Sequence, residues 1–152
     1  MSSRSDHEQI VRQFFDAYAA RTNAALARPP RLDVAGIRNA FAGYFVAASP
    51  AGVRGGRNGL LFRLMLRLGF RDYRRMGTRS IDLAGLDVTP IDDMHVMARA
   101  DWVARYDGTK GDGQDIAFTN HYFLQVRDGQ AKVFAYVTPD EQAALREHGL
   151  IG

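Results

Sequence analysis

The feature that most constrains the fold is a change in hydrophobic period after Gly77. Before this glycine, apolar residues recur about every 3.6 positions, as in helices, and after it they recur about every 2 positions, as in strands. The clearest strand pattern is the segment 96–106, where every second residue is apolar and polar residues fall between them. Such alternation predicts a strand with one buried face. Helices first and strands afterwards predict an α+β fold, with the helices on one face of a sheet.

Two further strands are predicted to pair as a hairpin. They span 116–126 and 131–137, and Asp128-Gly129 between them is typical of a two-residue turn. In the segment 81–88 the alternation changes parity near Gly85, which indicates a bulge. Because a bulged strand bends, the sheet is expected to be curved, mostly antiparallel and able to enclose a pocket.

Helical spacing dominates the first half of the chain. The first predicted helix begins at a capping box of Ser5 and Glu8, carries apolar residues at helical spacing from Ile10 to Leu26 and ends before Pro29-Pro30. Asp33 can cap a short second helix. A third helix is predicted from Leu60 to Met76, with an arginine stripe and an apolar arc around most of the remainder. A helix of this kind is expected to be buried on two sides. The stripe consists of Arg63, Arg67, Arg71 and Arg74.

The segments between and after these helices are predicted to be short. Phe45 to Ala48 is a strand candidate that ends at Ser49-Pro50. Gly52 to Gly59 is predicted to be a loop, because four of its eight residues are glycine. Thr138 is the expected N-cap of a last short helix with Pro139 at its start.

Composition indicates one ordinary globular domain spanning residues 1–152, since 46% of the residues are hydrophobic and 24% are charged. The chain has no cysteine, which excludes thiol nucleophiles, disulfides and cysteine-ligated metals. Its four histidines lack the spacing of a zinc site, so no metal or other cofactor is expected. No apolar run approaches the length of a bilayer span and the start is not leader-like, so we expect a cytoplasmic protein without a membrane partner.

Charge is distributed unevenly, although the net charge is only +3. Residues 54–79 hold eight arginines and one aspartate, whereas residues 80–115 hold eight aspartates and three basic residues. The arginine stripe could bind phosphate, nucleic acid or an anionic membrane surface. The modest net charge and the acidic segment instead favour pairing inside the fold or across a dimer, and nucleic acid is not an expected partner.

Several segments together carry a resemblance to a known family. They are a short strand ending at Ser49-Pro50, a glycine-rich loop, an arginine-bearing helix and a meander closing at Phe134–Val137. This order resembles the nuclear transport factor 2-like superfamily over nearly the whole chain. The segments 73–80, 121–125 and 138–150 look most like the small bacterial SnoaL-like proteins. The resemblance implies a cone-shaped α+β domain, with helices on the concave face of the sheet enclosing a pocket, and often a homodimer through the outer sheet face.

This superfamily includes isomerases, dehydratases, polyketide cyclases, epoxide hydrolases and members without catalysis, so the fold does not decide the function. In its steroid isomerase branch the base is an aspartate before a proline, where this chain has Ser49. A tyrosine donor of that branch falls on Phe14, with Tyr18 one turn later. A second donor, a protonated acid before a histidine, falls on Asn120 before His121. Asparagine can donate a hydrogen bond without a pKa change.

Asn120 is informative from the pattern alone, because it shares a strand face with apolar residues. An amide buried there without a partner costs roughly 1 to 3 kcal/mol, so it either meets a ligand or is satisfied by backbone or buried water. His121 points to the opposite face, where a simple turn would pair it with Tyr136, as a dimer contact or an acid–base group. Aromatic residues could line the cavity or form the core, namely Tyr18, Tyr44, Trp102, Tyr106 and Tyr122.

Two functions fit these observations. The first is a cofactor-independent lyase, isomerase or cyclase acting on an apolar, carbonyl-bearing small molecule, with Asn120 as the hydrogen-bond donor and with Tyr18 and His121 as further candidate catalytic residues. The candidate substrate-binding residues are Phe14, Tyr44, Ser49, Trp102 and Tyr122. The alternative is a non-catalytic ligand-binding or dimerisation module, which the loss of charge at two matched positions favours.

Overall fold

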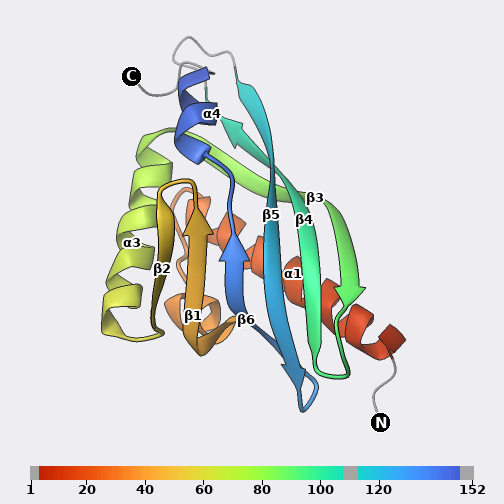
Figure 1. The fold of residues 1–152 in the computed structure, drawn as a ribbon. Coiled ribbons are helices and arrows are strands. Elements are labelled where there is room, and N and C mark those ends of the chain that lie inside the picture. The colour runs from red at the N-terminus through yellow and green to blue at the C-terminus, as the bar shows by residue number, and fades with distance from the viewer. Residues whose placement is uncertain (1–3, 108–112, 148–152) are drawn as a thin grey trace.

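Six strands form one curved sheet, and a long helix, α1, lies across its concave face (Figure 1). The computed structural model describes residues 4–107 and 113–147. The helices are α1 (Arg4–Leu26), α2 (Val34–Asn39), α3 (Leu60–Arg75) and α4 (Glu141–Glu147). The strands are β1 (Phe41–Ser49), β2 (Gly52–Arg57), β3 (Thr78–Pro90), β4 (His95–Tyr106), β5 (Gln114–Arg127) and β6 (Gln130–Val137). The predicted α+β architecture is therefore confirmed.

The strand order is β2-β1-β6-β5-β4-β3, and all neighbours are antiparallel except β1 and β6. The predicted bulge is present, because the register of β3 against β4 shifts between Leu83 and Gly85. The predicted hairpin turn is also present, with positive φ angles of 52° at Asp128 and 75° at Gly129. Two consecutive positive φ values belong to the turn type whose twist matches that of paired strands.

The core lies between α1 and the concave face of the sheet. Val11 and Phe15 of α1 are fully buried there. The alternation of β4 sends Ala98, Ala100 and Trp102 to the same side, where all three are buried. Because two of these β4 residues are alanines, the sheet presents little bulk at this point, and aromatic rings from other elements fill the space.

The helix starts confirm one prediction and overturn another. The Asp33 carboxylate accepts a hydrogen bond of 2.9 Å from the Gly36 N–H, as the predicted cap of α2 requires. Thr138 as the cap of the last helix is wrong. The chain continues without regular structure through Pro139, and the Asp140 carboxylate accepts from the Ala143 N–H at 3.0 Å.

The prediction of a loop at Gly52–Gly59 is also wrong. Residues 52–57 form β2, an exposed edge strand that pairs with β1 from Ser49 opposite Gly52 to Tyr44 opposite Arg57. Glycine has a low intrinsic preference for strands, but the backbone of β1 supplies the hydrogen-bonding partner, and tertiary pairing overrides such preferences.

Helix α3 differs from the prediction of burial on two sides. Only one of its faces packs inward, through the partly buried Phe62, Leu66 and Phe70. None of its residues is fully buried, because it lies at the rim of the molecule, beside β2 rather than across the sheet (Figure 1). Five large apolar residues of this helix are exposed, namely Leu60, Leu61, Leu64, Met65 and Leu68. Within the described ranges, no helix is long and apolar enough to cross a membrane.

Candidate functional site

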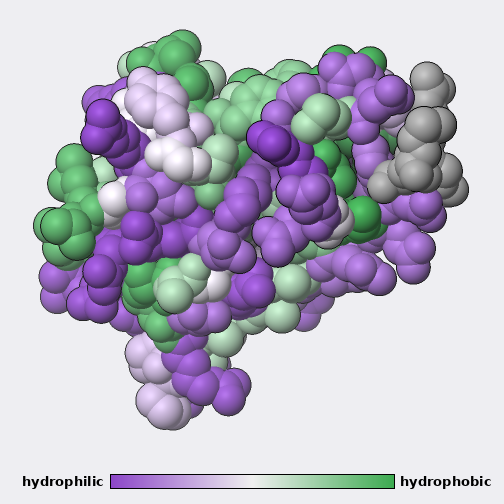
Figure 2. All heavy atoms as spheres, turned by 90° about the horizontal axis from the view of Figure 1, so that it is seen from below, coloured by the Kyte–Doolittle hydropathy of each residue, from purple (hydrophilic) through white to green (hydrophobic). Residues whose placement is uncertain are grey.

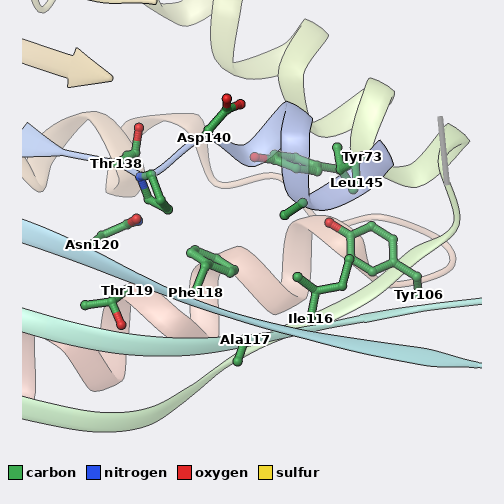
Figure 3. A pocket seen from close by; sticks show the side chains of 12 residues that line it. Tyr73, Tyr106, Ile116, Ala117, Phe118, Thr119, Asn120, Thr138, Asp140 and Leu145 are labelled. Carbon is green, nitrogen blue, oxygen red and sulfur yellow. The ribbon is translucent and has the colours of Figure 1, made fainter. Parts of the chain in front are cut away.

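Two neighbouring hollows lie between the helices and the sheet, and Asn120, Tyr73 and Thr138 line both. The first, about 320 Å³, is called here the tyrosine chamber. The second, about 290 Å³, lies under α4 and is called the α4 chamber (Figure 3). Both volumes are close to the lower end of the range for small-molecule sites. The tyrosine chamber is lined by Tyr18, Thr22, Ile37, Phe41, Phe62, Leu66, Phe70, Tyr73, Asn120, Tyr122, Tyr136 and Thr138.

The alternation of β5 places Asn120 and Tyr122 on the concave face. Their partners across the ladder on β4 are Ala100 and Ala98, which are both fully buried. A methyl group opposite each polar side chain leaves room above the sheet, and the ring of Phe15 from α1 takes part of it, with its centroid 4.9 Å from that of Tyr122. The small residues of β4 thus let α1 approach the sheet beside the chambers.

Asn120 and Tyr122 form a polar pair inside an apolar surface. The Asn120 Nδ2 donates a hydrogen bond of 3.0 Å to the Tyr122 hydroxyl. The Asn120 Oδ1 is buried and accepts no hydrogen bond from any described residue. Rotating the amide by a half-turn exchanges these roles, because Oδ1 then accepts from the Tyr122 hydroxyl and Nδ2 faces the chamber. The pair thus leaves one amide atom free, which is an acceptor in one rotamer and a donor in the other.

Three tyrosines converge beside this pair. The ring centroids of Tyr18 and Tyr122 are 6.4 Å apart, and those of Tyr122 and Tyr136 are 6.2 Å apart. Burial raises the pKa of Tyr18 well above its ordinary value, and the neighbouring Tyr122 and Tyr136 hydroxyls raise it further. Burial also raises the pKa of Tyr136. At neutral pH all three hydroxyls therefore carry their protons and are hydrogen-bond donors.

The pKa of Tyr122 is raised to about 12, mainly by burial, although its contacts with Asn120 and Trp102 act in the opposite direction. The Trp102 Nε1 lies near the Tyr122 hydroxyl but completes no hydrogen bond, and it is buried without a partner among the described residues. The floor of the site therefore contains two unpaired polar atoms, the Asn120 Oδ1 and the Trp102 Nε1, only one of which lines a chamber.

The tyrosine chamber has no carboxylate, imidazole, ammonium or guanidinium group among its lining residues. The α4 chamber has one carboxylate, Asp140, which also caps α4. No group of three or more described histidine, aspartate or glutamate side chains is placed to hold a metal ion. The tyrosine chamber offers neutral donors and acceptors between apolar walls, and the one carboxylate of the two chambers, Asp140, lies in the α4 chamber.

Comparisons with known proteins identify the family. The family described as NTF2-like protein (DUF6841) matches residues 6–141. The chain belongs to this family. No curated protein matches it.

Solved structures share the fold of this NTF2-like protein at low sequence identity. An NTF2-like protein with a cystatin-like fold from Novosphingobium aromaticivorans has a TM-score of 0.67 and 14% identity, over 95% of this chain and 88% of the other. Aln2 from a Streptomyces species has a TM-score of 0.66 and 16% identity, over 97% and 99%. A chain from Xanthomonas campestris that is provisionally named a polyketide cyclase has a TM-score of 0.54 and 18% identity, over 93% and 95%.

Some residues singled out from the sequence do meet in the NTF2-like fold. Tyr18, Asn120 and Tyr122 come together in the tyrosine chamber. Trp102 is buried behind them, with its ring centroid 6.1 Å from that of Tyr18, and it does not line the chamber. Phe14 stacks on Tyr18 at 6.1 Å but lines a separate surface hollow.

Other candidates lie elsewhere. Ser49 is exposed at the end of β1, where its hydroxyl accepts from the Ala51 N–H at 3.2 Å. Tyr44 is 60% exposed and its ring lies over Gly55 of the edge strand. Neither residue lines the tyrosine chamber or the α4 chamber.

His121 lies on the outer face of β5, opposite Val137 of β6 and Arg99 of β4. The predicted pairing of His121 with Tyr136 is wrong, because the register shifts between Phe123 and Leu124. The shift sets Tyr122 opposite Tyr136 and turns Tyr136 into the chamber. The side chains of His121 and Asn120 therefore lie on opposite sides of the sheet.

The chamber also contains residues that were missed from the sequence. Phe62, Leu66, Phe70 and Tyr73 recur at helical spacing, and this signal could have identified the face of α3 that lines the pocket. No sequence pattern placed Tyr136 in the chamber. Its side chain points there because the register of the β5–β6 hairpin shifts between Phe123 and Leu124, although the turn itself is regular. Thr138 follows β6 and enters both hollows only through the path of the chain toward α4.

Proposed function

We propose that this NTF2-like protein binds a small, largely apolar, oxygen-bearing molecule in the tyrosine chamber. The observation that carries the proposal is the buried Asn120 Oδ1, which has no partner among the described residues, beside a hydroxyl that the same amide already engages. A buried acceptor without a partner costs about 1 to 3 kcal/mol, and a ligand that supplies the missing hydrogen bond recovers this cost.

The lining supports a flat or ring-bearing ligand. Phe41, Phe62 and Phe70 provide apolar walls, and the phenols add polar edges. A ligand hydroxyl can donate to Oδ1 in the observed rotamer, and a ligand carbonyl can accept from Nδ2 after the amide turns. The Tyr18 and Tyr136 hydroxyls, protonated at neutral pH, are second donors within the same chamber. Apolar walls with a few converging polar groups are typical of small-molecule sites.

A second candidate is a cofactor-independent lyase, isomerase or cyclase. One observation favours it, namely that Asp140 and Asn120 line the same α4 chamber. The Asp140 carboxylate would take a proton from carbon beside a substrate carbonyl, and Asn120, with its amide turned so that Nδ2 faces the chamber, would stabilise the oxygen that gains charge. Binding is the better supported function, because the tyrosine chamber itself offers no group that is a base at neutral pH.

The test uses three probes of similar size that differ in polar group: naphthalene, 2-naphthol and 1-tetralone. Calorimetric titration of the protein into each probe is expected to give an affinity about tenfold higher for the two oxygenated probes than for naphthalene, since one recovered hydrogen bond contributes about 1.4 kcal/mol. In Asn120→Leu this preference should disappear. Gln130→Leu, which removes an exposed amide from β6, is the matched control and should retain it.

Equal affinity for all three probes in the wild-type protein, or a preference that survives Asn120→Leu, would contradict the proposal. The catalytic candidate is tested separately with Asp140→Asn. If the wild-type protein catalyses incorporation of solvent deuterium at the carbon beside the carbonyl of 1-tetralone and this variant does not, the protein is an enzyme and not only a binding protein.

A further inference from the structure

The outer face of α3 is apolar although no described segment covers it. Leu60 is 79% exposed, Leu61 70% and Met65 57%. Leu64 and Leu68 extend the same face along the helix. The opposite face of α3 packs inward through Phe62, Leu66 and Phe70, so the exposed leucines are not needed for the core. These five exposed residues, Leu60, Leu61, Leu64, Met65 and Leu68, are called here the α3 apolar face.

Figure 2 shows hydrophobic side chains gathered at the edge of the molecule on which α3 lies in Figure 1, with hydrophilic ones around them. The hydrophilic border is basic. Arg63, Arg67 and Arg71 follow one another at intervals of four residues and therefore run along one side of the helix. Arg75 continues this charge at the C-terminal end of the helix, and Arg57 precedes the helix on the edge strand.

The arginine stripe was expected to pair inside the fold or across a dimer. Inside the fold, Arg74 of the stripe donates to the Ala25 carbonyl at 3.0 Å, but the arginines of the border are not neutralised by a distant carboxylate. Arg63, Arg67 and Arg75 form no ion pair with a described residue, and Arg71 has only Asp72 of its own helix at 3.7 Å. Several aspartates of the acidic segment are engaged elsewhere. Asp107 pairs with Arg79 at 2.7 Å, and Asp101 lies 3.5 Å from Arg99. The basic border of the α3 apolar face is therefore available to bind a negatively charged surface outside this chain.

We propose that α3 docks on an anionic lipid bilayer, with its axis along the surface, the α3 apolar face in the headgroup boundary and the bordering arginines on the lipid phosphates. A basic helix with a strongly apolar side is typical of interfacial membrane binding. A second copy fits less well, because Asp72 is the one carboxylate of α3, so two such faces would bring the arginines of both copies together with too few carboxylates to balance them.

The experiment is flotation of the full chain with vesicles of phosphatidylcholine alone or with about one-third phosphatidylglycerol. Binding is expected to the anionic vesicles at low salt and to weaken at high salt. Leu61→Gln/Met65→Gln should reduce partitioning more than tenfold, and Arg63→Gln/Arg67→Gln should reduce it about fivefold for each arginine. The matched controls are Ile91→Gln, which changes an exposed apolar residue on a remote turn, and Arg127→Gln on the β5–β6 hairpin, and both should bind as the wild type does.

A second measurement locates the contact. Leu61→Trp adds an indole to the α3 apolar face, whereas the natural Trp102 is buried, so an emission blue shift on anionic vesicles reports entry of α3 into the lipid boundary. The proposal is overturned if the wild-type chain fails to float with anionic vesicles at low salt, or if Ile91→Gln reduces binding as much as Leu61→Gln/Met65→Gln. It is also overturned if this double variant converts a dimer into a monomer in light scattering, since a second copy would then occupy the face.

Discussion

Replacing both members of the Asn120–Tyr122 pair by apolar residues of similar shape is predicted to stabilise the unliganded protein. In Asn120→Leu/Tyr122→Phe the unpartnered Oδ1 disappears, and the hydroxyl that the amide engaged disappears with it. No polar atom of the pair remains buried. Removing both partners of a buried hydrogen bond is nearly neutral or stabilising, whereas removing one leaves the other unsatisfied.

The magnitude follows from two opposing contributions. Losing the unpartnered Oδ1 returns about 1 to 3 kcal/mol, and losing the 3.0 Å hydrogen bond from Nδ2 to the Tyr122 hydroxyl costs about 1 kcal/mol. The net expectation is a gain of about 1 kcal/mol in the free energy of unfolding. For a chain of this length that gain raises the midpoint of thermal unfolding by about 2 to 4 °C. Asn120→Ala alone should lose about 1 kcal/mol, because the gain from losing Oδ1 is outweighed by the Tyr122 hydroxyl that stays buried without its donor and by the cavity that the amide leaves.

The assay is urea unfolding followed by far-ultraviolet circular dichroism, which does not depend on the fluorescence of Trp102 beside the altered site. The predicted order of stability places the double variant at or above the wild type and Asn120→Ala below both. A double variant that loses more than about 1 kcal/mol would contradict this prediction, because it would mean that the amide is fully satisfied in the free protein. The function proposed for this amide would then lose its physical basis.

Three further predictions concern other parts of the molecule. Tyr122 alone should lower stability by up to about 2 to 3 kcal/mol between roughly pH 10 and pH 12, because the unfolded chain releases its proton near the ordinary pKa of 10.0 while the folded chain holds it up to a pKa of about 12. The raised pKa values of Tyr18 and Tyr136 add to the fall, so in a pH-dependent urea series Tyr122→Phe should remove only the Tyr122 part. Asp33→Ala should cost about 1 kcal/mol in thermal unfolding, since the Gly36 N–H loses its acceptor, and no change would show that the cap contributes nothing. Gly129→Ala should cost about 1 kcal/mol in the same assay because of the positive φ at this position, and an unchanged midpoint would contradict the turn geometry.

The parts of the fold that were predicted correctly are those specified by local patterns. The alternation along 96–106 fixed the buried face of β4, and Asp128-Gly129 fixed the turn between β5 and β6. The change of parity near Gly85 located the bulge of β3. The alternation along 116–126 placed Asn120 and Tyr122 on one face of β5, which is why the sequence could predict that these two side chains lie together.

The errors arise where distant segments decide the outcome. Residues 52–57 form a strand because they pair with the backbone of β1, and no local pattern in these glycine-rich residues indicates that pairing. The apolar arc of α3 indicated burial, yet the helix lies at the rim, where its outer half has no neighbour among the described residues. Tyr136 enters the chamber because one extra residue of β6 is accommodated between Phe123 and Leu124. Such a shift leaves no trace in the hydrophobic pattern of either strand.

The proposed hydrogen bond between a ligand and Asn120 is tested most directly by following the NMR signal of the Asn120 side-chain amide while a ligand binds. In an ¹⁵N-labelled sample its resonance is assigned by its absence from Asn120→Leu, and 2-naphthol is then added. This resonance is predicted to shift in a saturable manner with the affinity measured by calorimetry, because the ligand hydroxyl completes the hydrogen bond that Oδ1 lacks. A probe that binds while this resonance stays fixed, and only amides of the outer sheet face move, would contradict this prediction.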